Sequence, residues 1–186
     1  PICMRVTGSR NHFSNVNIGG MGAANGAADT AGRSLAIAGG AENTFDGCRI
    51  GLDTVSRTAA NAEIGFTSGA ARNTFRNCHI VSYVAASGGS ASHLFVDASA
   101  TSSLDRDTAF DECIFVTYPT GLLSALTLTN AMNIASDSGG IVLLKKPMFI
   151  GATNICAADN GNVFIDYTYD GTQGTKAGAK GVALLR

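Results

Sequence analysis

NTFDGCRI at residues 43–50 and NTFRNCHI at residues 73–80 are near copies of one eight-residue unit. Related units are NHFSNVNI at 11–18, TAFDECIF at 108–115 and a weaker VLLKKPMF at 142–149. The copies recur every 30 to 35 residues. A fixed period of this length is typical of a solenoid, in which each repeat forms one coil and stacks on the previous one.

Three positions of the unit keep their chemistry from copy to copy. The first is an aromatic residue or Leu: Phe13, Phe45, Phe75, Phe110 and Leu144. The second is small or apolar: Val16, Cys48, Cys78, Cys113 and Pro147. The third is large and apolar: Ile18, Ile50, Ile80, Phe115 and Phe149. Because like side chains stack between coils, we expect an aromatic stack, a thiol ladder and an aliphatic column inside the solenoid.

A further apolar column is expected upstream of each unit. It comprises Val6, Ile37, Phe66, Val96, Leu128 and Ile165. Around it apolar residues alternate with other residues, as in Leu35 and Ile37, which is typical of strands with one buried face. Stretches rich in Gly, Ala and Asn lie between the columns and predict turns.

These observations predict an all-β protein, a right-handed parallel β-helix of about five to six coils over residues 1–170. Residues 171–186 are expected to form a flexible C-terminal segment or a cap. The alternative is an antiparallel sandwich, which also has short strands and Gly-rich turns. A sandwich does not require the same residue type every 30 residues or so, whereas a solenoid does.

Polar residues also recur in register with the apolar columns. Charge alternates through the column that comprises Ser14, Asp46, Arg76, Asp111 and Lys145. Opposite charges on neighbouring strands attract, and Glu42 and Arg72 are expected to pair in the same way. Asn11, Asn43 and Asn73 open their units and predict a hydrogen-bonded amide ladder.

Composition excludes several classes of function. The net charge is −1 and the Lys and Arg residues are scattered, so nucleic acid is not expected as a partner. No apolar run approaches the ~20 residues of a membrane helix, and the first residues lack a signal-peptide pattern. Five cysteines without CxxC spacing predict reduced, buried thiols. A start at Pro1, within an expected strand, suggests a fragment of a longer chain.

Few residues could carry catalysis. Glu63 and His93 are expected at equivalent, outward-facing positions of successive coils, with Asp97 nearby. An acid beside an imidazole could transfer protons, and glycan-cleaving enzymes need paired carboxylates. Solvated strand faces commonly carry such pairs as ordinary surface residues, and this is the favoured interpretation.

Two further groups are candidate binding residues. Tyr83 and Tyr118 are expected at neighbouring positions and could form a small platform for sugars. Asp105 and Asp107 lie in an expected loop insertion, SATSSLDRDTAFDE, but lack the ligand spacing of a Ca²⁺ site. We therefore predict no metal site and no cofactor.

The N-x-F-x-N-C-x-I-like units resemble the right-handed parallel β-helix family of pectate-lyase-like enzymes, bacteriophage tailspikes and other virion proteins. The resemblance covers nearly the whole chain and implies the fold more strongly than the activity. It leads us to expect a non-enzymatic structural component of a phage particle, a trimeric spike, fibre segment or capsid decoration assembled in the host cytoplasm. The alternative is a spike module that binds or depolymerises host surface glycan. A surface-binding solenoid would need a regular Thr column, which the sequence lacks.

Overall fold

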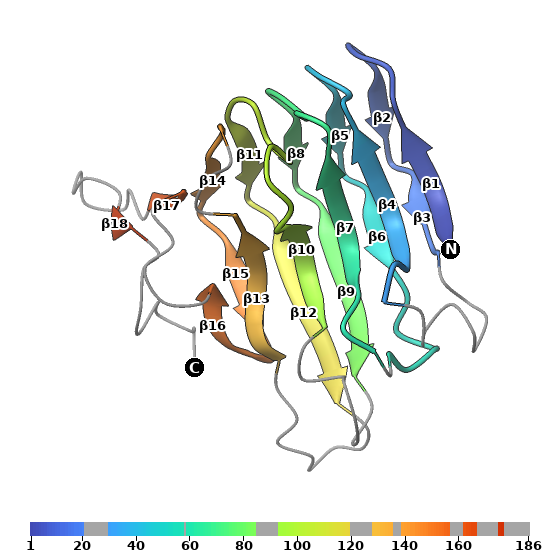
Figure 1. The fold of residues 1–186 in the computed structure, drawn as a ribbon. Coiled ribbons are helices and arrows are strands. Elements are labelled where there is room, and N and C mark those ends of the chain that lie inside the picture. Colours follow the sequence, from blue (N-terminus) through green and yellow to red (C-terminus); the bar gives the residue numbers. More distant parts are fainter. Residues whose placement is uncertain are drawn as a thin grey trace.

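The computed structural model describes residues 1–20, 30–57, 59–84, 93–119, 128–135, 139–156, 162–166 and 175–176. Within these ranges every regular element is a strand, and no helix is long and apolar enough to cross a membrane. The strands form three sheets, which we name A, B and C (Figure 1). The predicted all-β parallel β-helix is confirmed.

Each sheet collects one strand from each successive coil. Sheet A contains β1 (Ile2–Val6), β4 (Arg33–Ala38), β7 (Ala62–Thr67), β10 (Leu94–Ala98), β13 (Leu128–Ile134) and β16 (Ala152–Cys156). Sheet B contains β2 (His12–Ser14), β5 (Thr44–Asp46), β8 (Thr74–Arg76), β11 (Thr108–Asp111), β14 (Val142–Lys145), β17 (Val163–Asp166) and β18 (Thr175–Lys176). Sheet C contains β3 (Asn17–Ile18), β6 (Arg49–Gly51), β9 (His79–Val84), β12 (Ile114–Pro119) and β15 (Met148–Ile150).

The chain passes from sheet A to B to C and returns to sheet A one strand further along, as the colour order in Figure 1 shows. Sheet C has five strands, so four full turns separate β3 from β15. This is slightly fewer than the five to six coils expected. All strand pairs are parallel except β17 and β18, which are antiparallel.

The aromatic column of sheet B forms one continuous stack. Phe45 lies 4.8 Å from Phe13 and 4.7 Å from Phe75, between ring centroids, and Phe75 lies 4.6 Å from Phe110. These spacings match the distance between paired strands. The stack continues through Leu144 to Ile165. Beside it, sheet C aligns its own column in register: Ile18, Ile50, Ile80, Phe115 and Phe149.

Two polar ladders follow the same register. The thiols of Cys48, Cys78 and Cys113 are buried, and each donates to the carbonyl oxygen of the Phe one coil earlier, over 3.4 to 3.5 Å. The Asn43 amide donates to Oδ1 of Asn73 at 2.9 Å, and Asn11 donates to Asn43 at the same distance. The predicted thiol and amide ladders are therefore confirmed.

The turn between sheets B and C repeats one backbone conformation. Its central residue has a positive φ in five coils: Asn15, Gly47, Asn77, Glu112 and Lys146. Asn and Gly tolerate this left-handed region best, which explains their place in the unit. Glu112 and Lys146, which replace them, form an ion pair of 2.7 Å between coils.

Charged columns also align as expected. Asp46 pairs in register with Arg76, which pairs with Asp111 and then Lys145. Glu42 accepts hydrogen bonds from Arg10 and from Arg72, and these two bonds lower the pKa of its carboxyl group. Charges that face solvent between coils thus support the register modestly.

The predicted sheet A column is wrong from Val96 onward. Val6, Ile37 and the next strand align as expected, but Val96 pairs with Ile64 rather than Phe66, and Leu128 pairs with Ala152. Ile165 belongs to sheet B, next to Leu144. A slip of two residues keeps every side chain on the same face, so alternation could not reveal it.

The predicted C-terminal segment lies largely outside the described residues. Of residues 171–186, the structure describes only β18, which pairs with β17.

Candidate functional site

A groove of about 360 Å³ on sheet A is the first candidate site. Its floor consists of small residues on neighbouring strands, Ala36 and Gly65, and its polar wall includes Arg33 and Asp97. The exposed Arg5 lies in register with Ala36 at one side of the groove. The strands β1, β4, β7 and β10 that build it are neighbours in Figure 1.

Arg33 spans this groove and fixes Asp97. Its guanidinium group forms an ion pair with Asp97, and both side chains are less than one fifth exposed. A Cβ atom added at Gly65 would lie 2.8 Å from Nε of Arg33, so Gly65 leaves the space through which the Arg33 side chain passes. The second carboxylate oxygen of Asp97 accepts a bond of 3.1 Å from the Ser99 backbone N–H.

This geometry suits binding better than proton transfer. Asp97 is the one acidic residue among the described residues that line the groove, and Arg33 and Ser99 engage both of its oxygens. Hydrolysis of a glycosidic bond ordinarily requires two carboxyl groups. The exposed side chains of Arg5, Thr67 and Ser99 can donate hydrogen bonds to a polar ligand.

Glu63 and His93 do not lie on the solvent-exposed face that the sequence suggested. Both are fully buried. Glu63 forms a two-point ion pair with the fully buried Arg57, at 2.9 and 3.0 Å, and accepts a hydrogen bond from Ser34. His93 contacts Glu63 at 3.3 Å and Asn61 through Nδ1. We call these five residues the buried polar cluster.

The expected register of this pair is also wrong. Leu94 pairs with Ala62, which places His93 beside Asn61 rather than beside Glu63. Arg57, in the segment between β6 and β7, covers the buried polar cluster. It forms a parallel β-bridge to Val84, and its backbone N–H donates to the Tyr83 carbonyl at 2.6 Å. Neither Glu63 nor His93 can therefore touch a substrate in this structure.

Burial lowers the pKa of His93, and the neighbouring Glu63 only partly opposes this effect. Arg57 and Arg33 lower it further. The imidazole is therefore neutral at pH 7. A buried, ion-paired cluster of this kind is structural in character.

Tyr83 and Tyr118 lie side by side as expected. They are register partners on β9 and β12, Tyr118 is 48% exposed, and Tyr83 is half-buried. The adjacent outward positions are aliphatic: Val81, Val116 and Ile150. The pair thus belongs to an apolar face rather than to a polar groove.

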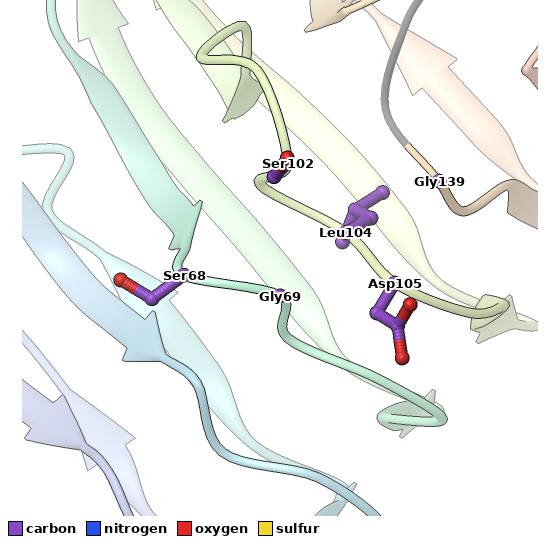
Figure 2. A pocket seen from close by; sticks show the side chains of 6 residues that line it. All are labelled: Ser68, Gly69, Ser102, Leu104, Asp105 and Gly139. Carbon is purple, nitrogen blue, oxygen red and sulfur yellow. The ribbon is translucent and has the colours of Figure 1, made fainter.

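Asp105 lines a second hollow, of about 370 Å³, at the turns between sheets A and B. Figure 2 shows Ser68 and Gly69 on one turn, Ser102, Leu104 and Asp105 on the next, and Gly139 beyond them. The expected loop does not bulge freely, because Leu104 is fully buried and bridges to Ala70.

The acids near this hollow do not form a metal site. Asp105 is exposed and pairs with Arg106 at 3.0 Å. Asp107 is also exposed and is not among the lining residues. Across the described ranges, no group of three or more His, Cys, Asp or Glu side chains could hold a metal ion.

Three of the buried cysteines, Cys48, Cys113 and Cys156, are poor nucleophiles. Burial raises the pKa of Cys48, and raises that of Cys156 to about 11. A hydrogen bond with Cys78, together with burial, raises the pKa of Cys113. Only thiolates are strongly nucleophilic, so these three side chains act as packing groups. The hydrogen bond with Cys113 lowers the pKa of Cys78, but Cys78 is fully buried.

Sequence reasoning missed Arg57, Ser34 and Arg33. Arg57 occurs in a turn, LDTVSRTAANA, where no periodic pattern marks a buried cation. A usable signal existed only for Glu63, because it stands in the mainly apolar stretch AEIGF. A buried charge there requires an opposite charge nearby.

Comparison with protein-family models, curated proteins and solved structures found no match.

Proposed function

We propose that this protein is a structural module of a bacteriophage particle, such as a spike, a fibre segment or a capsid decoration. The observation that carries the proposal is the continuous stack from Phe13 to Phe110, with rings 4.6 to 4.8 Å apart. The amide and thiol ladders follow the same coils. A closely packed column of this kind resists bending and shear, which suits a protein whose function depends on its rigid shape.

The buried polar cluster supports a structural role. Glu63 and His93, the residues best suited to acid–base chemistry, form contacts that tie the β6–β7 turn to the ends of β7 and β10. Their burial assigns them to the scaffold. The virion context rests on the resemblance of the repeat to virion β-helix proteins, and so does the expectation of a trimer.

Incubation with bacterial capsular polysaccharide and lipopolysaccharide tests this proposal. A structural module releases no new reducing ends, and its thermal unfolding temperature does not change with added glycan. Turnover of any of these polysaccharides would overturn the proposal. Asp97→Asn is the matched variant, since Asp97 lines the sheet A groove and a lost activity in a folded variant would assign catalysis to that groove.

Glycan binding is the second candidate function, and the sheet A groove favours it. Arg5, Thr67 and Ser99 offer donors along a concave surface, beside the fixed carboxylate of Asp97. Concave sites with a few convergent polar groups are typical binding sites. Saturable binding of an oligosaccharide that Arg5→Ala weakens, with Arg10→Ala as the surface control, would favour this function over the first.

A further inference from the structure

The outer face of sheet C carries a contiguous apolar patch. On β12 and β15 the residues that alternate with the core residues Phe115 and Phe149 face outward. These outward residues are Ile114, Val116, Tyr118, Met148 and Ile150, of which Val116 is only 7% exposed. Tyr118, Met148 and Ile150 are 48%, 36% and 47% exposed, and they are three of the five exposed large apolar side chains among the described residues.

The patch is confined to one part of the face. Towards β3 the row of Ile114 becomes polar, with His79, Arg49 and Asn17 in register, whereas the row of Val116 continues through the buried Val81 to Gly51. Isolated apolar residues are common on surfaces, but a contiguous patch bordered by polar residues marks an interface. Among the described residues of sheet C, the exposed large apolar side chains lie on β12 and β15 alone, so these two strands carry the apolar surface.

Charges at the rim indicate which partner fits. Glu112 precedes Ile114 by two residues, and Lys146 precedes Met148 by two, so the two charges stand at the same height along their strands. Both side chains are about half exposed, and they already pair within the chain at 2.7 Å. The rim thus offers one acid and one base, next to each other, beside two apolar strands.

We propose that this face binds the same face of a second copy of the chain, about a two-fold axis parallel to the strands and between β12 and β15. That axis places β12 of one copy over β15 of the other. Ile114 then faces Met148 of the second copy, Val116 faces its Ile150, and Glu112 faces its Lys146. Every contact is complementary in chemistry, as an isologous interface requires.

Other arrangements lack this match. A two-fold axis along the solenoid would make the strands of the two copies run in opposite directions. Glu112 of one copy would then no longer face Lys146 of the other. The proposal deepens the structural role, on which it rests, by naming the partner and the surface. It also predicts a pair where the resemblance leads to the expectation of a trimer.

Sedimentation velocity over a range of protein concentrations tests the proposal. The protein should sediment as a dimer, with twice the monomer mass of 19.0 kDa. Ile150→Glu places a charge in the patch centre and should weaken dimerisation about tenfold or more. The control is Ile2→Glu, at a residue 45% exposed on β1 of sheet A, which should leave the dimer intact.

A charge exchange tests the axis. Glu112→Lys should weaken dimerisation about two- to fivefold, and adding Lys146→Glu in the same chain should restore it. Unchanged circular dichroism and thermal unfolding establish that each variant folds. A monomer at all concentrations, a trimer, or a dimer insensitive to Ile150→Glu would overturn the proposal. These results leave the glycan-turnover test of the proposed function untouched, so the two can fail separately.

Discussion

Sheet B and the buried polar cluster hold neighbouring coils together by different means. Sheet B repeats one apolar residue type per coil, so that Phe45 and Phe75 meet the same neighbours one step apart. At the cluster, Arg57, Glu63 and His93 occur once, and Arg57 and His93 both contact Glu63. Periodic packing distributes stability along the solenoid, whereas the cluster concentrates it where β4, β7 and β10 lie side by side and depends on every partner.

The largest expected effect is on the aromatic stack. Phe75→Ala removes a fully buried ring that contacts Phe45 and Phe110, and should lower the free energy of unfolding by about 4 kcal/mol. Denaturant unfolding measures this. Phe13→Ala is the control, because Phe13 is only partly buried and stacks on a single described ring, Phe45. Equal losses at both positions would contradict a continuous stack.

The cluster should respond nearly as strongly to the loss of one charge. Glu63→Gln leaves the guanidinium of Arg57 buried without a counter-charge, and should cost about 3 kcal/mol in the same unfolding measurement. Combining Arg57→Met with Glu63→Leu should recover much of the loss, because well-packed apolar pairs often replace buried ion pairs at little cost. A double variant less stable than Glu63→Gln would indicate that the ion pair itself is required.

Substitution of Asn43 tests the amide ladder, and the expected loss of stability is smaller. Asn43→Ala removes the acceptor for two donors of Asn11 and the donor to Asn73, and should cost about 2 kcal/mol. Hydrogen exchange should show the loss at the Asn11 amide. Asn15→Ala is unsuited as a control because Asn15 has a positive φ, so the exposed Asn17 serves instead. An unchanged exchange rate at Asn11 would show that the ladder is not stabilising.

Substitution of Thr117 should raise the free energy of unfolding, whereas the substitutions above should lower it. Its hydroxyl oxygen is buried without a hydrogen-bond partner among the described residues, next to the Ser82 hydroxyl, which is in the same state. Thr117→Val keeps the shape and removes the polar atom, and should raise the free energy of unfolding by about 1 kcal/mol. Val116→Thr, at the neighbouring outward position, should not stabilise. A destabilised Thr117→Val protein would show that the hydroxyl is satisfied.

The smallest effect is a pH dependence that separates the two regions. Burial lowers the folded-state pKa of His93 below its usual 6.5, so the unfolded chain binds a proton first as the pH falls. The stability that the neutral His93 contributes to the folded state is complete above pH 6.5. It is lost progressively as the pH falls towards the pKa of His93 in the folded protein. His93→Gln should remove this dependence, and His79→Gln, at an exposed position, should not. If the stability of His93→Gln varied with pH in the same way as that of the unsubstituted protein, His93 would not be the source of the pH dependence.

Much of the periodic region could be predicted from sequence. The N-x-F-x-N-C-x-I-like units contain strands of sheets B and C and the turn between them, and stacking demands the same residue at Phe45 and Phe75. The small Asn15 and Gly47 at this turn reflect a backbone conformation that few residues accept. Repetition thus makes register visible in one sequence.

The candidate site could not be predicted in the same way. Glu63 alternates with apolar neighbours and was expected to face solvent, but the β6–β7 turn brings Arg57 against it. Contacts between an irregular turn and a strand leave no period to detect. Asp97, a candidate from the sequence, lines the sheet A groove, but its fixed pairing with Arg33 depends on a register that alternation cannot determine.

Disulfide trapping between neighbouring coils tests the stacked register most directly. In a Cys3→Ser background, Asp46→Cys combined with Arg76→Cys places two thiols at register partners, about 4.8 Å apart between Cα atoms. The pair should oxidise readily, whereas Asp46→Cys with Asp111→Cys, two coils apart, should not. Efficient trapping of the second pair, or none of the first, would contradict the β-solenoid register.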